Sequence, residues 1–133
     1  MGVGTAASGV QGEIRATNNI TAYYSSDARL KEKIVQIENA VNKLSKIRGV
    51  TFNWTDEYIK QHGGEDGYFV RNPDVGVIAQ ELLMVLPEAV AERPDGMLAV
   101  KYDRIVALLI EAIKEQQLTI NELEARINKI ESK

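Results

Sequence analysis

The sequence has no cysteine and a single histidine, His62, among its 133 residues. The lack of cysteine excludes disulfides, thiolate zinc sites and thiol catalysis. A metal site would have to rely on carboxylates beside His62, so we expect neither a metal nor another cofactor. No apolar run approaches the roughly 18 residues of a membrane-spanning helix, and the net charge of −3 provides no basic face. We therefore expect no membrane partner and no nucleic-acid partner.

Aromatic residues are also scarce, at 6%, whereas hydrophobic residues make up 44% of the chain. Aliphatic residues therefore have to build the core, and we expect an α+β fold that is mainly helical. From Asp27 onward the apolar residues recur at intervals of three and four, which predicts an amphipathic N-terminal helix that Gly49 ends. The stripe consists of Leu30, Ile34, Ile37, Val41, Leu44 and Ile47.

Short β-strands are expected on both sides of this helix, because short stretches there alternate or are rich in β-branched residues. The expected strands cover residues 13–24, 50–54 and 75–78. Residues 79–86 predict a short helix that stops before Pro87. Residues 90–102 predict a hairpin that turns at Pro94, Asp95 and Gly96.

One long polar stretch, residues 55–74, carries three glycines and a proline. This composition predicts a mobile loop or a hairpin arm rather than a helix. We place His62 within it as a solvated side chain.

The C-terminal stretch, residues 102–133, contains no proline or glycine and has an unbroken heptad pattern. Apolar residues at heptad positions a and d predict a parallel coiled coil over about residues 103–132, because such a seam needs copies of itself to cover it. We call these residues the seam: Val106, Ile113, Ile120 and Ile127 at a, and Leu109, Gln116, Leu123 and Ile130 at d.

The number of strands in this coiled coil follows from the residues in and beside the seam. β-Branched a residues with leucine at d favour dimers, whereas Ile130 at d and apolar residues beside the seam favour three strands. We expect a homotrimer and keep the dimer as the alternative. Arg126 and Glu131 occupy the g and following e positions that pair between parallel strands, and Gln116 is a polar residue that sets the register.

The stretch "YYSSDARLK" contains the remaining candidate chemistry. Ser26 and Lys31 can form a nucleophile and general base without histidine or cysteine, provided that burial makes the lysine amine neutral. On a regular helix, five positions would place Ser26 and Lys31 about 140° apart. If Ser26 instead precedes the helix, the chain can turn and bring Lys31 back toward it. The alternative is structural: Asp27 caps a helix and the serines do no chemistry.

Several motifs occur in order from about Tyr24 to the C-terminus. They are a Ser-Asp-x-Arg-x-Lys block, a Phe-x-Trp strand, a Gly-x-Ile-Ala-Gln-Glu block followed by Leu-Pro-Glu, a Val-x-Tyr strand and the heptad helix. In this combination the chain resembles the intramolecular chaperone domain of phage tailspikes and tail fibres, the endosialidase-type auto-processing family, peptidase family S74.

The resemblance implies a C-terminal domain that trimerises and helps an upstream fibre or stalk of the same polypeptide to fold. It then releases itself by autocatalytic cleavage. Carried over, Ser26 is the nucleophile, Lys31 is its base, and the cut falls at Ser25–Ser26. Residues 1–25 then belong to the stalk and residues 26–133 to the chaperone domain. Asp27 is a possible supporting residue or only a cap.

The family block also contains Gln80 and Glu81. Glu81 is a candidate to orient Lys31 or a neighbouring group, and a helix-surface or capping role is the alternative. The resemblance further implies action in the host cytoplasm during virion assembly. It leaves two other functions open: a trimerisation module that does not cleave, and a self-cleaving domain of a cellular trimeric protein, since the family also occurs in a membrane-bound eukaryotic transcription factor. A cellular coiled-coil adaptor would share the heptads but would not need the serine-lysine block.

Overall fold

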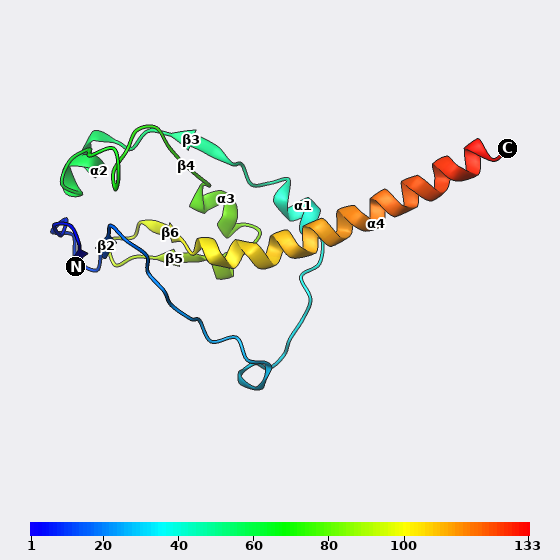
Figure 1. Cartoon of the computed structure of the whole chain (residues 1–133), viewed down its shortest axis with the longest axis horizontal. Helices are drawn as coiled ribbons and strands as arrows, with labels where there is room; N and C mark the ends of the chain where they lie inside the picture. The colour runs from blue at the N-terminus through cyan, green and yellow to red at the C-terminus, as the bar shows by residue number, and fades with distance from the viewer. The chain divides into compact units, whose positions relative to one another are not determined.

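The computed structural model describes all 133 residues and contains helices and small strands, ending in one long helix (Figure 1). This mixture confirms the expected combination of helices and short strands. The α-helices are α1 (Ala40–Leu44), α2 (Asp56–Gln61), α3 (Ala79–Leu83) and α4 (Ile105–Glu131), and the 3-10 turns are η1 (Ala28–Leu30), η2 (Pro87–Ala89) and η3 (Tyr102–Arg104).

The strands form three separate two-stranded sheets. The strands are β1 (Gly2–Val3), β2 (Arg15–Ala16), β3 (Val50–Phe52), β4 (Asp74–Gly76), β5 (Val90–Glu92) and β6 (Leu98–Val100). β1 pairs in parallel with β2, and β5 pairs in antiparallel fashion with β6. The third pair consists of β3 and β4. The pair of β5 and β6 confirms the predicted hairpin, in which Val90 faces Val100 and Gly96 adopts a positive φ of 84° in the turn.

The chain divides into two compact units, each made of two sequence segments. Unit 1 comprises Met1–Ile34 and Thr51–Gly76, and unit 2 comprises Val35–Val50 and Val77–Lys133. The proposed serine-lysine site belongs to unit 1. The heptad helix belongs to unit 2.

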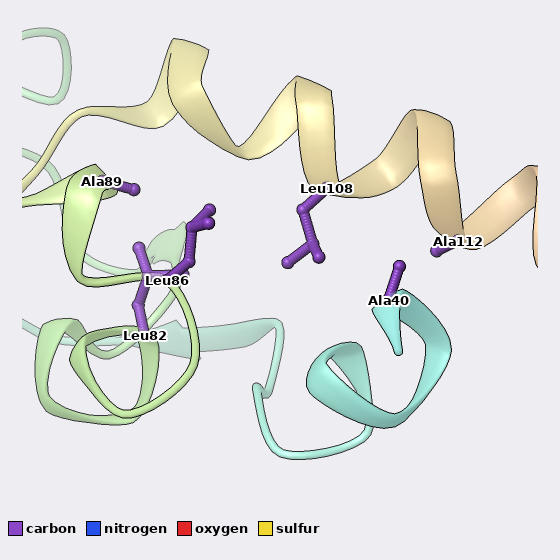
Figure 2. Close-up of a cluster of buried hydrophobic side chains, with 6 residues drawn as sticks. All are labelled: Ala40, Leu82, Leu86, Ala89, Leu108 and Ala112. Carbon is purple, nitrogen blue, oxygen red and sulfur yellow. The ribbon is translucent and has the colours of Figure 1, made fainter. Parts of the chain in front are cut away.

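The core of unit 2 lies where the first half of α4 meets α1 and α3 (Figure 2). Leu108 and Ala112 of α4 point toward this core, with Ala40 on α1 opposite them (Figure 2). The buried residues of the cluster are Ala40, Leu82, Leu86, Ala89, Leu108 and Ala112. Small residues at the helix contact allow the short α1 to lie close to α4, and dispersion contacts accumulate over the cluster.

Two carboxylates bind the segment that carries α1. Glu115 of α4 accepts hydrogen bonds from the backbone N–H groups of Ala40 and Val41, at 2.8 and 2.9 Å. These are N–H groups of the first turn, which have no partner within the helix itself. Glu81 of α3 accepts from the guanidinium of Arg48, with a shortest distance of 2.6 Å, and from the backbone N–H of Arg48.

The predicted long helix from Asp27 to Gly49 is wrong. Only the 3-10 turn η1 and the five residues of α1 are helical, and positive φ angles at Lys33 and Asn39 interrupt the helix between them. The second half of the stripe does pack against the core of unit 2, whereas Leu30 and Ile34 are exposed. An apolar stripe forms a helix in water only where packing stabilises it, and a single chain offers the first half no packing surface.

The predicted loop over residues 55–74 is also wrong in part, because it contains α2. Thr55 caps this helix by accepting from the N–H of Tyr58, and acidic Asp56 and Glu57 occupy its first turn. His62 is half-buried rather than solvated, and its ring stacks on Tyr58 at a centroid distance of 3.8 Å. The ring of Trp54 also stacks on Tyr58, at a centroid distance of 4.0 Å.

The long C-terminal helix was predicted correctly as a helix, since α4 runs for 27 residues. Its seam residues are all exposed in the single chain, with Ile113 at 65% and Ile130 at 69% exposure. None of the helices combines the length and the apolar character that crossing a bilayer requires.

Candidate active site

The site begins at a single 3-10 turn that follows Ser26. Asp27 is the N-cap of η1, and its carboxylate accepts from the backbone N–H of Arg29 at 2.9 Å. The same carboxylate binds the guanidinium of Arg29 through two further hydrogen bonds, at 3.1 and 2.9 Å. The hydrogen bonds from the side chain and then the backbone of Arg29 lower the pKa of Asp27. Asp27 therefore acts as the cap that the sequence indicated, on a shorter turn.

This turn brings Lys31 back to Ser26. The backbone of Lys31 leaves the turn in an extended conformation, and its N–H bonds the carbonyl of Ala28 at 3.1 Å. The ammonium nitrogen Nζ of Lys31 donates to Oγ of Ser26 at 2.8 Å. Ser26 precedes the turn and Lys31 follows it, so the two side chains avoid the separation that a regular helix would impose.

The side chains of this pair are exposed to solvent within one chain. Ser25, Ser26 and Lys31 are all exposed, as are the neighbouring Tyr23 and Tyr24, at 95% and 75%. The single chain thus brings the two side chains together but leaves both of them exposed to solvent.

The remaining candidates occupy other elements. Gln80 and Glu81 lie on α3, where Gln80 is exposed and the carboxylate of Glu81 binds Arg48. The side chain of Arg48 is the first cause that lowers the pKa of Glu81. An open apolar pocket beside the first half of α4 is lined in part by two seam residues, Val106 and Leu109, together with Leu44 and Ile47 of unit 2.

Sequence reasoning missed two polar residues that organise the two units. Glu115 binds the start of α1, and Arg15 is the one charged residue that is buried. Glu115 falls between seam positions and looks like an ordinary surface residue of a heptad helix. A signal for Arg15 did exist, because it is the only basic side chain in residues 1–25.

Comparison with known proteins assigns the chain to a family. Residues 26–91 match the family model Peptidase_S74, described as chaperone of endosialidase. The chain belongs to the chaperone-of-endosialidase family. The family match starts at Ser26, the first residue of the candidate pair.

Curated relatives place this family domain in long fibres. The chain is 38% identical over 123 residues to the long tail fiber protein Gp37 of Enterobacteria phage K3, covering 87% of this chain and 9% of that protein. It is 41% identical over 96 residues to the Gp37 of Escherichia phage AR1, covering 70% of this chain and 8% of that protein. The chain thus spans less than a tenth of the length of these fibre proteins.

A cellular relative is more distant. The myelin gene regulatory factor-like A protein of Dictyostelium discoideum is 26% identical over 135 residues, covering 93% of this chain and 14% of that protein. The chaperone-of-endosialidase domain therefore has relatives both in phage fibres and in a cellular protein.

Proposed function

We propose that this chain is the trimerisation and intramolecular chaperone domain of a phage tail fibre, and that it releases itself by cleavage between Ser25 and Ser26. Residues 1–25 are then the end of the fibre, and residues 26–133 are the chaperone. The observation that carries the proposal is the 2.8 Å contact between Lys31 and Ser26 at the first residue of the family match. The identity to phage long tail fibres supports the fibre as the client and virion assembly in the host cytoplasm as the setting.

The chemistry needs only the groups of this turn. The neutral amine of Lys31 takes the proton from Oγ of Ser26 while Oγ attacks the carbonyl carbon of Ser25. The tetrahedral species collapses with cleavage of the Ser25–Ser26 C–N bond, and the ammonium of Lys31 returns the proton to the leaving nitrogen. An ester then links the Ser25 carbonyl to Oγ. Water hydrolyses it, which leaves a carboxylate on Ser25 and restores the hydroxyl of Ser26.

Assembly supplies the surface that the seam lacks. Seven of its eight residues are apolar, and all are exposed along α4. Ile120, Leu123 and Ile127 are covered when parallel copies of α4 pack side by side, which is the arrangement that their heptad spacing favours. The open pocket at Val106 and Leu109 continues this apolar surface toward the core of unit 2.

Coupling of cleavage to assembly follows from the exposure of Lys31. Making its amine neutral requires loss of water around it, and neighbouring subunits are the available source of cover. The turn would then be inactive in a lone chain and active in the trimer. The three chains of a β-structured fibre can pair in many registers, and a trimer of α4 helices would align them first. With cleavage coupled to assembly, only aligned trimers would lose the chaperone domain.

The test uses four variants and intact-mass measurement after purification. Ser25→Ala should yield two fragments with a new N-terminus at Ser26, because Ser25 supplies only its carbonyl. Ser26→Ala should stay whole yet fold, because Asp27 still caps the turn. Lys31→Ala and Lys31→Arg should both stay whole, since a guanidinium remains protonated and cannot act as base.

The outcome that contradicts cleavage is equally plain. If all four variants and the parent chain remain near 14.8 kDa, the domain does not cleave itself. The trimerisation and chaperone role would then stand alone.

A further inference from the structure

The proposed scissile bond lies within a compact unit rather than between two. Unit 1 contains the chain on both sides of Ser25–Ser26, together with residues 51–76. We call residues 1–25 the lead and residues 51–76 the arm. Cleavage of one backbone bond leaves the contacts between the lead and the arm in place, so chemistry alone would not separate the two products.

Arg15 is the centre of the contact between the lead and the arm. It is 8% exposed and is the only buried polar or charged residue of the chain. Its guanidinium Nη2 donates to the backbone carbonyl of His62 at 2.8 Å. Its guanidinium carbon also lies 5.2 Å from the centroid of the Phe69 ring, within range of a cation–π interaction. Both partners belong to the arm.

The lead holds Arg15 in position from its own side. β2 pairs with β1, and the backbone N–H of Arg15 bonds the carbonyl of Met1 at 2.8 Å. Glu13 accepts from Nε of Arg15 at 3.1 Å and also from the hydroxyl of Ser8. The guanidinium is therefore oriented before it meets the arm, which reduces the conformational entropy lost in the contact.

The arm presents a preformed partner. The carbonyl that accepts from Arg15 belongs to His62, whose ring stacks on Tyr58. Phe69 is held in a tight loop in which Asp66 accepts from the backbone N–H groups of residues 68, 69 and 70. The carbonyl and the ring are thus fixed by the arm itself.

Charge favours the same pairing. The arm carries five acidic and two basic side chains, whereas Arg15 is the only basic side chain of the lead. Hydrogen bonds from the backbone of Val70 and Tyr68 lower the pKa of Asp66, and the charge of Arg15 adds to this effect. Removing Arg15 would leave the lead with Glu13 facing a net negative arm.

We propose that the arm is the surface by which the chaperone domain grips the end of its fibre, that Arg15 anchors this grip, and that the two products stay bound after cleavage until the contact breaks. The identification of the products rests on the proposed cleavage at Ser25–Ser26. The contact itself does not. Self-cleavage and release are then two separate events, and the strength of the Arg15 contact sets the delay between them.

The experiment makes the cut without the serine-lysine pair. In a Ser26→Ala chain, the recognition sequence of a site-specific protease replaces residues 18–23, which are exposed. After complete cleavage, native mass spectrometry follows how fast the N-terminal fragment leaves. The parent should retain it, and Arg15→Ala should release it about tenfold faster or more, because a hydrogen bond from a charged donor is lost in a buried site.

Two further variants separate this grip from general damage. Phe69→Leu should also speed release, because it removes the ring under the guanidinium. Arg71→Ala should behave like the parent, since Arg71 is an exposed arginine of the same arm that bonds Pro73 within the arm. Trp54 fluorescence checks that the arm keeps its fold in each variant.

Two results would overturn the grip: immediate loss of the fragment from the cut parent, or equal retention by Arg15→Ala and the parent. Neither result depends on self-cleavage, because the protease makes the cut. Conversely, a chain that never cleaves itself leaves this measurement unaffected.

Discussion

The two halves of α4 have different relations to the rest of their own chain. In the first half, from Ile105 to Glu115, Leu108 and Ala112 are buried against α1 and α3, and Glu115 binds the start of α1. From residue 116 to residue 133 every side chain is exposed. The first half is thus part of a core that one chain can complete. The second half has the same apolar spacing but contributes no residue to this core, and we propose that its spacing serves contacts with other copies.

The largest expected effect comes from placing charge in the second half. Ile120→Asp combined with Leu123→Asp should abolish assembly, because each layer of a trimer would bury three unpaired carboxylates. The core of unit 2 should survive, since neither residue belongs to it. Sedimentation equilibrium should give a monomer, and intact-mass measurement should show no cleavage even though Ser26 and Lys31 are unchanged.

The matched control for this variant adds the same two charges outside the seam. Asn121→Asp combined with Asn128→Asp changes two b positions of the heptad and should leave assembly intact. A trimer formed by the Ile120→Asp, Leu123→Asp chain would show that the seam does not hold the chains together.

An effect of intermediate size is expected from two neighbouring leucines of α4, one in the core of the chain and one in the seam. Leu108 is fully buried, whereas Leu109 belongs to the seam and is 42% exposed. In the monomeric double-aspartate background, Leu108→Ala should lower the free energy of unfolding by about 2–5 kcal/mol, and Leu109→Ala by less than about 0.5 kcal/mol. Urea unfolding followed by circular dichroism measures both. Equal losses would mean that Leu109 also belongs to the core of the single chain.

The smallest effect lies at the boundary between the halves, at Glu115. Hydrogen bonds from the backbone N–H groups of Val41 and Ala40 lower the pKa of this carboxylate in the folded chain. Its contribution to stability is therefore present above the ordinary carboxyl pKa of about 4.5 and is lost as the pH falls through the lower folded value. Glu115→Gln should lower the melting temperature at neutral pH, and the melting temperature of the variant should fall less than that of the parent as the pH drops below 4.5. Thermal unfolding across a pH series measures both effects.

Much of the fold could be predicted from local pattern. The hairpin at β5 and β6 carried its own turn residues, and α4 carried an unbroken period without proline or glycine, so local chemistry decided both. The helix from Asp27 could not be predicted correctly, because its length depended on what the stripe packs against. Glu115, 75 residues away from Ala40, sets where α1 starts. The short α2 was missed because glycines after it dominated the composition of its stretch.

In the candidate site, too, the features set by neighbouring residues could be predicted, whereas contacts between distant residues could not. The cap at Asp27 and the approach of Lys31 to Ser26 depend on a few successive residues, so the sequence could indicate them. The binding of Glu81 to Arg48 and of Arg15 to the arm depends on residues 33 and 47 positions apart. Arg15 stands out as the only basic side chain of residues 1–25, but no local pattern tells which distant residue such a side chain contacts.

Activation of cleavage by assembly can be tested in one experiment. The chain is refolded from denaturant over a range of concentrations, and each sample is measured both for its sedimenting mass and for its initial rate of cleavage by intact mass. If assembly activates cleavage, the rate should rise with the fraction of chains at three times 14.8 kDa, and the C-terminal fragments should begin at Ser26. Cleavage at the same rate in samples that sediment as monomers would contradict it.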